Sequence, residues 1–120
     1  MPRKEWTNVC ICGAKYEVRD SLVRHVAIYN DPRVHAIKRG DRTLDKDQKY
    51  SLYAALEDAG HKLSPVEQET LYMRVEFIIS VGHYDPQSLR HTLYIDDFRL
   101  KEEQWLALEQ MVGTIVREHA

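Results

Sequence analysis

The chain has 120 residues, of which 43% are hydrophobic and 30% are charged, so it can bury a core and is too apolar for wholesale disorder. It has no run near the roughly eighteen apolar residues that would predict a membrane span. The net charge of −2 is unevenly divided, because residues 1–50 sum to +4 and residues 51–120 to −6. Only the first half is therefore suited to approach a polyanion such as nucleic acid.

The cysteine content points to a reducing environment. Cys10 and Cys12 are the only two cysteines, and a disulfide across a single intervening residue would be strained and would close almost no loop. We therefore expect thiols that are free or bound to a metal, which predicts a cytoplasmic protein.

The first 40 residues read as a small module. Asp20 is suited to cap a helix over residues 21–30, whose apolar positions share one face. Asp31 and Pro32 then predict either a turn or a new helix start. The polar, charged stretch 41–50 is the best candidate for a linker. We expect a module over 1–40 and a body over 41–120, with one compact domain as the alternative.

The body mixes helix and strand signals. Residues 47–59 predict a helix that Gly60 ends, and Ser64 to Glu67 match a capping box that starts another. Alternating apolar residues over 71–81 predict a strand, although a helical face fits them too. Residues 90–100 predict a second strand that pairs with the first as a hairpin, and residues 101–118 predict the clearest helix. The expected fold class is α+β, a finger-like module with a β-hairpin packed on helices, or else mostly α.

A spacing motif lies at the front of the chain. Tyr16 follows Cys12 by four positions, Leu22 precedes His25 by three, and twelve residues separate Cys12 from His25. This pattern resembles the two-Cys, two-His zinc finger, in which the second Cys, the aromatic, the Leu and the first His keep that register. The resemblance implies a bound zinc, cysteines on a tight hairpin and a His on the inner face of the following helix.

The same segment departs from the finger pattern in two places. Only Ile11 separates Cys10 from Cys12, whereas the family has at least two residues there. The second His is missing from its usual positions, which leaves His35 or, as a rarer choice, the carboxylate of Asp31. The candidate zinc ligands are therefore Cys10, Cys12, His25 and His35. The alternative is a strand–turn–helix unit without metal, in which the cysteines are small buried hydrophobic residues.

Function is predicted to be binding rather than catalysis. If the finger binds nucleic acid, Lys15, Arg19 and Arg24 are the candidate contacts, but a lone finger of modest charge binds DNA weakly. We expect a small intracellular regulatory protein that acts through protein contacts, as an inhibitor or adaptor of a nucleic-acid machine. Direct DNA or RNA binding by the basic front half is the first alternative. A small hydrolase is the second, with the histidines His83 and His91 and the acid Asp85.

Overall fold

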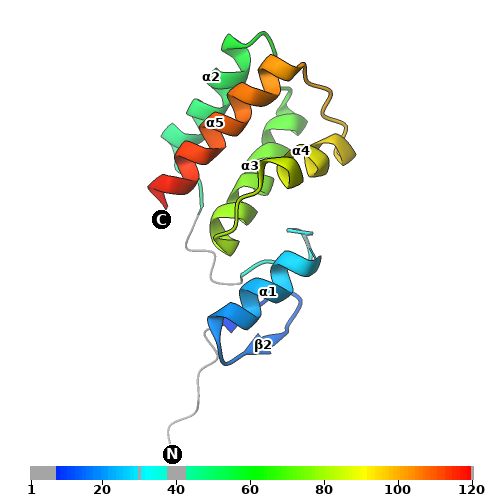
Figure 1. Ribbon diagram of the computed structural model, residues 1–120, viewed down its shortest axis with the longest axis vertical. Helices are drawn as coiled ribbons and strands as arrows, with labels where there is room; N and C mark the ends of the chain where they lie inside the picture. The colour runs from blue at the N-terminus through cyan, green and yellow to red at the C-terminus, as the bar shows by residue number, and fades with distance from the viewer. Residues whose placement is uncertain (1–7, 30, 38–42, 120) are drawn as a thin grey trace, which may run out of the picture.

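The N-terminal part of the protein is a small hairpin and helix that lies at one end of a four-helix body (Figure 1). The computed structural model describes residues 8–29, 31–37 and 43–119. We call residues 8–37 the finger unit and residues 43–119 the helical body. The module boundary expected between residues 40 and 41 lies outside the described residues.

The finger unit is built around a very short antiparallel sheet. Strand β1 (Asn8–Val9) pairs with β2 (Lys15–Tyr16), and helix α1 (Arg19–Tyr29) follows. Gly13 has φ +100°, a backbone conformation that favours glycine, and its N–H donates to the Cys10 carbonyl at 2.9 Å, which closes the hairpin turn.

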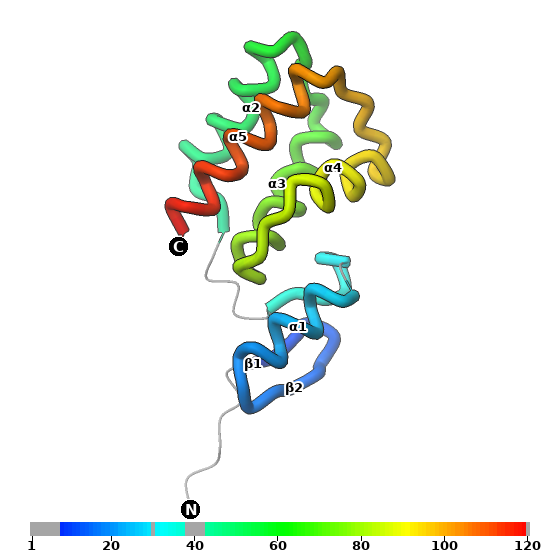
Figure 2. Tube along the Cα trace, viewed as in Figure 1, coloured from blue at the N-terminus to red at the C-terminus, as the bar shows by residue number. Residues whose placement is uncertain are grey.

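The chain after α1 returns to the hairpin. Residues 32–34 form a turn rather than a new helix. Ile37 then makes an antiparallel bridge with Cys10, and the N–H of Ile11 donates to the carbonyl of Ala36 at 2.9 Å. Cys10 is consequently held between two stretches of backbone. Figure 2 shows this return path beside the hairpin and α1.

Four helices form the body: α2 (Lys46–Asp58), α3 (Pro65–Val81), α4 (Pro86–Ile95) and α5 (Glu102–Glu118). Helices α2 and α5 lie side by side, and α3 packs against α5 and α1 (Figures 1 and 2). None of the helices in the described ranges is long and apolar enough to cross a membrane.

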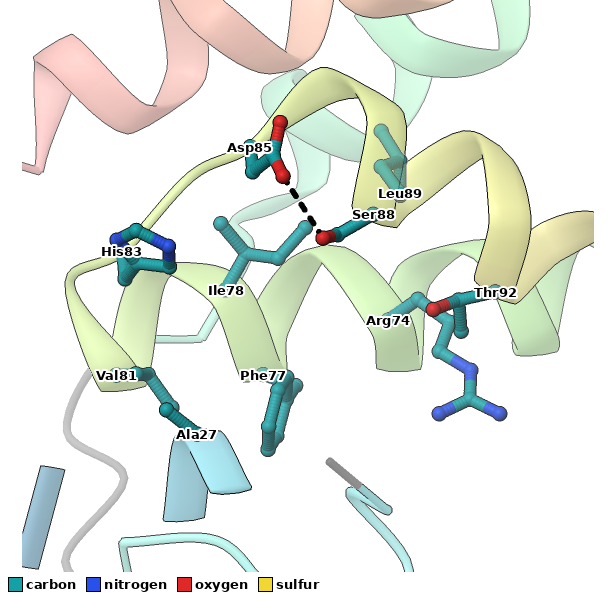
Figure 3. A pocket seen from close by; sticks show the side chains of 10 residues that line it. All are labelled: Ala27, Arg74, Phe77, Ile78, Val81, His83, Asp85, Ser88, Leu89 and Thr92. Atoms are coloured by element: carbon teal, nitrogen blue, oxygen red, sulfur yellow. Dashed lines mark hydrogen bonds between the residues drawn. The ribbon is translucent and has the colours of Figure 1, made fainter. Parts of the chain in front are cut away.

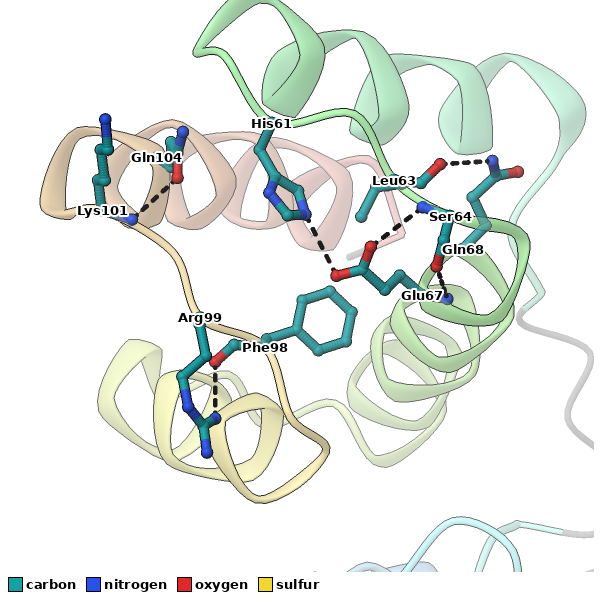
Figure 4. A network of polar contacts seen from close by, with 9 residues as sticks. All are labelled: His61, Leu63, Ser64, Glu67, Gln68, Phe98, Arg99, Lys101 and Gln104. Atoms are coloured by element: carbon teal, nitrogen blue, oxygen red, sulfur yellow. Dashed lines mark hydrogen bonds and ion pairs between the residues drawn. The ribbon is translucent and has the colours of Figure 1, made fainter.

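The helix starts follow the local sequence signals. Ser64 accepts a hydrogen bond from the N–H of Glu67, and the Glu67 carboxylate accepts one from the N–H of Ser64, so the capping box at the start of α3 is confirmed (Figure 4). The second carboxylate oxygen of Glu67 lies 3.2 Å from Nε2 of His61. Asp45 and Gln48 form the same reciprocal pair at the start of α2. The helices expected over 21–30, 47–59 and 101–118 are likewise present as α1, α2 and α5, apart from residue 30, which lies outside the described residues. Asp20 does not cap α1 as expected, because α1 begins at Arg19 and Asp20 lies in its first turn.

The strand predicted over residues 71–81 is wrong, because this segment forms the last part of α3. Apolar residues alternate from Met73 to Val81 because other parts of the protein cover α3 on several sides, so that apolar side chains are buried on more than one face of the helix. Val75 and Ile79 are buried in the body core, while Phe77 and Val81 are buried toward the finger unit. A helix that is apolar all round loses its 3.6-residue signal and can resemble a strand.

The second predicted strand, residues 90–100, is also wrong. Residues 86–95 form α4, which Asp85 caps and whose buried side is carried by Leu89 and Leu93, four residues apart. The hairpin expected in the body is therefore absent from the described residues there, and the sheet lies in the finger unit instead. The α+β or mostly α fold class is confirmed by five helices and one two-stranded sheet.

Polar and apolar contacts join the finger unit to the body. Arg19 Nη2 on α1 donates to the carbonyl of Ser80 on α3 at 3.5 Å. Within the body, the N–H of Leu44 donates to the carboxylate of Glu76 on α3 at 3.0 Å, which holds the start of the body against the same helix. The pKa of the Asp31 carboxyl group is lowered mainly by the hydrogen bond from the Arg33 N–H, and the charge of Arg74 on α3 adds a smaller effect from the body.

Candidate metal centre

Four side chains of the finger unit converge on one point. They come from the residue after β1 (Cys10), the hairpin turn (Cys12), helix α1 (His25) and the returning segment (His35), and one ligand atom of each lies within 4.8 Å of all the others. No other group of three or more such residues is found in the described ranges. The candidate ligands expected from the sequence are thus brought together.

Three of the distances between these atoms are close to the edges of a tetrahedral zinc site. Zinc bonds of about 2.3 Å to sulfur and about 2.05 Å to nitrogen give tetrahedral edges of about 3.6 Å between sulfur and nitrogen and about 3.3 Å between nitrogens. Cys12 Sγ lies 3.5 Å from Nε2 of His25, Cys10 Sγ lies 3.7 Å from Nδ1 of His35, and the two nitrogens are 3.2 Å apart. These are three of the six edges of such a tetrahedron and the other three are no longer than 4.8 Å, so the arrangement could hold a metal ion.

The two histidines present different ring nitrogens. His25 points Nε2 inward from α1, whereas His35 points Nδ1 inward from the returning segment. The ring of Tyr29 stacks on the ring of His35 with centroids 4.5 Å apart, and Tyr16 packs 5.4 Å from the ring of His25. Both imidazole rings therefore pack against aromatic side chains, which restricts the orientation of the rings.

Asp31, the other candidate for the fourth ligand, is directed elsewhere. Its carboxylate accepts a hydrogen bond from the N–H of Arg33 at 3.0 Å and one from the Arg33 guanidinium at 3.4 Å. The bond from the Arg33 backbone is the main reason that the pKa of Asp31 lies below its usual value. The structure thus favours His35 over Asp31 as the fourth member of the group.

Of the two candidate ligands whose pKa is shifted, only His25 is held in the protonation state that binds a metal. Burial and the nearby His35 lower the pKa of His25, which keeps its imidazole neutral and able to ligate. Burial raises the pKa of the Cys10 thiol, so in the absence of a cation this sulfur is protonated near neutral pH. Cys10 is fully buried, while Cys12 is exposed.

The residues expected to contact nucleic acid lie in different settings. Lys15, Arg19 and Arg24 are all exposed, and the Arg19 guanidinium also donates to the carbonyl of Ser80 on α3 at 3.5 Å. If Arg19 is position 1 of the finger helix, the base-reading positions −1, 3 and 6 hold Val18, Ser21 and Arg24. Only one of these three side chains is basic.

The residues named for a hydrolase are not arranged as a catalytic array. The Asp85 carboxylate accepts hydrogen bonds from the N–H of Gln87 and the hydroxyl of Ser88, as an N-cap does. Among the described residues, His83 makes no hydrogen bond to Asp85 or Ser88, and His91 borders a different hollow.

Comparisons with models of protein families, with curated proteins and with solved structures find no match for this chain. The interpretation of the site therefore rests on its geometry. Sequence reasoning missed Tyr29, whose stacking on His35 orders the fourth candidate ligand. The spacing of four between His25 and Tyr29 was a signal for it, because residues four apart share a helix face.

Proposed function

We propose that Cys10, Cys12, His25 and His35 hold one structural zinc ion, and that the protein acts by binding a protein partner. The distances of 3.5, 3.7 and 3.2 Å between candidate ligand atoms carry the zinc proposal, because they match the edges of one coordination tetrahedron. With four protein ligands no position is left for a substrate or water, which favours a structural over a catalytic role.

A structural ion also explains how so small a unit stays folded. Among the described residues of the finger unit, its buried apolar side chains are few, chiefly Cys10, Leu22, Val26 and Ile37. Its strands are two residues long. Units with so little core usually need a metal or a crosslink, and zinc binding then supplies folding free energy directly.

Protein contact is the role that the surface supports best. Residues 1–42 carry nine Lys or Arg and five Asp or Glu, a net charge of +4, and residues 43–120 carry eight and fourteen, a net charge of −6. The front segment is therefore only modestly basic, and a lone finger of this charge binds nucleic acid weakly. Val18, just before α1, and Ile28 on α1 are 58% and 70% exposed. We propose an adaptor or inhibitor in the cytoplasm, where the cysteines stay reduced.

Metal analysis of the purified protein tests the zinc proposal. We expect about one equivalent of zinc, and Co²⁺ substitution should give the visible absorption of a tetrahedral thiolate site. Cys12→Ser and His25→Gln should reduce the zinc content, whereas His91→Gln, a matched change at an exposed histidine outside the group, should not. Protein free of zinc after expression in zinc-supplemented medium would refute the proposal.

A salt titration with duplex DNA separates protein binding from nucleic-acid binding. Phosphate contacts are strongest at low salt, so the proposal predicts no measurable affinity for DNA or RNA even at about 20 mM salt. Binding at low salt that Lys15→Ala and Arg24→Ala abolish, and that Lys62→Ala in the body leaves unchanged, would instead establish the nucleic-acid alternative.

A further inference from the structure

A cavity of about 190 Å³ lies where the finger unit meets the body. We call it the interface cavity. It is bounded by α1, α3, α4 and the loop before α4, and its lining comprises Ala27, Arg74, Phe77, Ile78, Val81, His83, Asp85, Ser88, Leu89 and Thr92. Figure 3 shows Ala27 of α1 next to Val81, with Ile78 and Phe77 between His83 at one end and Arg74 at the other.

The charged groups at its edge are already paired. The Arg74 guanidinium is 7% exposed and donates two hydrogen bonds to the Asp96 carboxylate, at 2.8 and 3.2 Å. Asp85 accepts hydrogen bonds from Gln87 and Ser88 at the start of α4. What the cavity offers to a ligand is therefore mainly the apolar surface of Phe77, Ile78 and Val81 with their neighbours.

The size of the cavity suits one large side chain. A dry cavity of about 150 Å³ lined by apolar side chains accepts benzene, so 190 Å³ accommodates one aromatic ring system or a leucine. Binding surfaces commonly place such a single anchor in a pocket and surround it with polar contacts.

The charge around the cavity determines which residues can lie beside the inserted side chain in the partner. The lining contains one acid, Asp85, and one arginine, Arg74, whose charge Asp96 already balances, and the body that supplies nine of the ten lining residues carries a net charge of −6 over residues 43–119. An apolar anchor between basic residues would be attracted to this surface, and one between acidic residues would be repelled.

We propose that the interface cavity receives one aromatic or leucine side chain of a basic segment in a partner protein. This inference rests on the proposed protein-binding function and assigns it a place and a partner chemistry. Because Ala27 lies two residues after His25 on α1, the wall of the cavity and the metal centre belong to one helix.

The test uses the zinc-loaded full chain and defined peptides, followed by nuclear magnetic resonance. An acetylated and amidated Lys-Lys-Trp-Lys-Lys peptide should shift the methyl signals of Ile78, Val81 and Leu89 saturably, with an affinity that falls as salt rises. A Glu-flanked Trp peptide, a Lys-flanked Ala peptide and neutral N-acetyl-tryptophanamide should bind at least about tenfold more weakly.

Two variants fill the cavity from opposite walls. Ala27→Phe on α1 and Thr92→Phe on α4 should each weaken peptide binding by at least about tenfold. Val66→Phe, at a residue 73% exposed and outside the cavity lining, is the matched control and should bind normally. Two variants are tested in case one of them fails to fold. A thermal unfolding curve of each variant would show such a failure.

Several results would overturn the inference. These are no methyl shifts, equal binding of the Glu-flanked peptide, equal binding of the Ala peptide, or normal binding by both filled variants. Equal affinity for N-acetyl-tryptophanamide would mean a site for small neutral molecules and would also overturn it. Zinc content is measured on the same samples, so zinc retained without peptide binding refutes the cavity alone, and peptide binding without zinc refutes the metal centre alone.

Discussion

Replacing His35 with glutamine tests the fourth zinc ligand most directly. His35 places Nδ1 at 3.2 Å from Nε2 of His25 and 3.7 Å from Sγ of Cys10, as the proposed zinc site requires of its fourth ligand. Four-ligand zinc sites bind with roughly 10–16 kcal/mol, so an equal share is about 2.5–4 kcal/mol per ligand. His35→Gln should therefore weaken zinc binding by roughly 10²–10³-fold.

The assay is competition against a zinc chelator of known affinity, monitored at pH 7.5 under reducing conditions. Asp31→Asn should change the zinc affinity by less than about threefold, because that carboxylate is bound to Arg33 rather than directed at the site. His91→Gln should have no effect. Unchanged affinity in His35→Gln, or an equal loss in Asp31→Asn, would refute the assignment of the fourth ligand.

Three further predictions concern the body and are measured by urea unfolding. Asp96→Ala should lower the free energy of unfolding by about 3 kcal/mol, because it leaves the buried Arg74 guanidinium without its partner, and Arg74→Met combined with Asp96→Leu should restore part of the loss. Leu108→Ala should cost about 2–5 kcal/mol, since Leu108 is fully buried. Tyr84→Phe should cost about 1 kcal/mol at pH 9 through its lost hydrogen bond to the Glu109 carbonyl, and should make stability less sensitive to alkali.

The sign of the alkaline effect follows from the pKa of Tyr84. Burial, with the nearby carboxylates of Glu109 and Asp85, raises this pKa from 10.0 to about 12. The unfolded chain therefore loses the phenolic proton first, so the stabilisation is present below pH 10 and is lost between pH 10 and about 12. Equal losses of stability at alkaline pH in wild type and Tyr84→Phe would contradict this account of Tyr84. A Leu108→Ala variant of unchanged stability, or an Asp96→Ala variant as stable as wild type, would contradict the prediction made for that variant.

Helix starts were predictable because their signals are local. The capping box at Ser64 and Glu67 and the acidic first turn of α5 act within a few residues of sequence. The later part of α3 was not predictable in this way. Its strand-like alternation reflects burial by the finger unit on one side and by the body on the other, and no short window of sequence contains both partners.

The candidate site likewise has one part that the sequence predicts and one part that depends on tertiary contacts. The spacing from Cys12 to His25 is a property of the sequence, since a turn and one helix suffice to bring these two residues together. The choice of His35 over Asp31 depended on the path of residues 31–37. That path is set by the bridge between Cys10 and Ile37 and by the stacking of Tyr29 on His35.

The sequence by itself determined the spacing from Cys12 to His25, the capping box that starts α3, and the uneven charge, because each depends on near neighbours or on composition. Only the tertiary structure decided that residues 71–81 are helical, that Arg19 is bound to α3, and that a cavity opens between the finger unit and the body. These features arise from surfaces far apart in the chain, whose contacts depend on how the units pack and not on any local pattern.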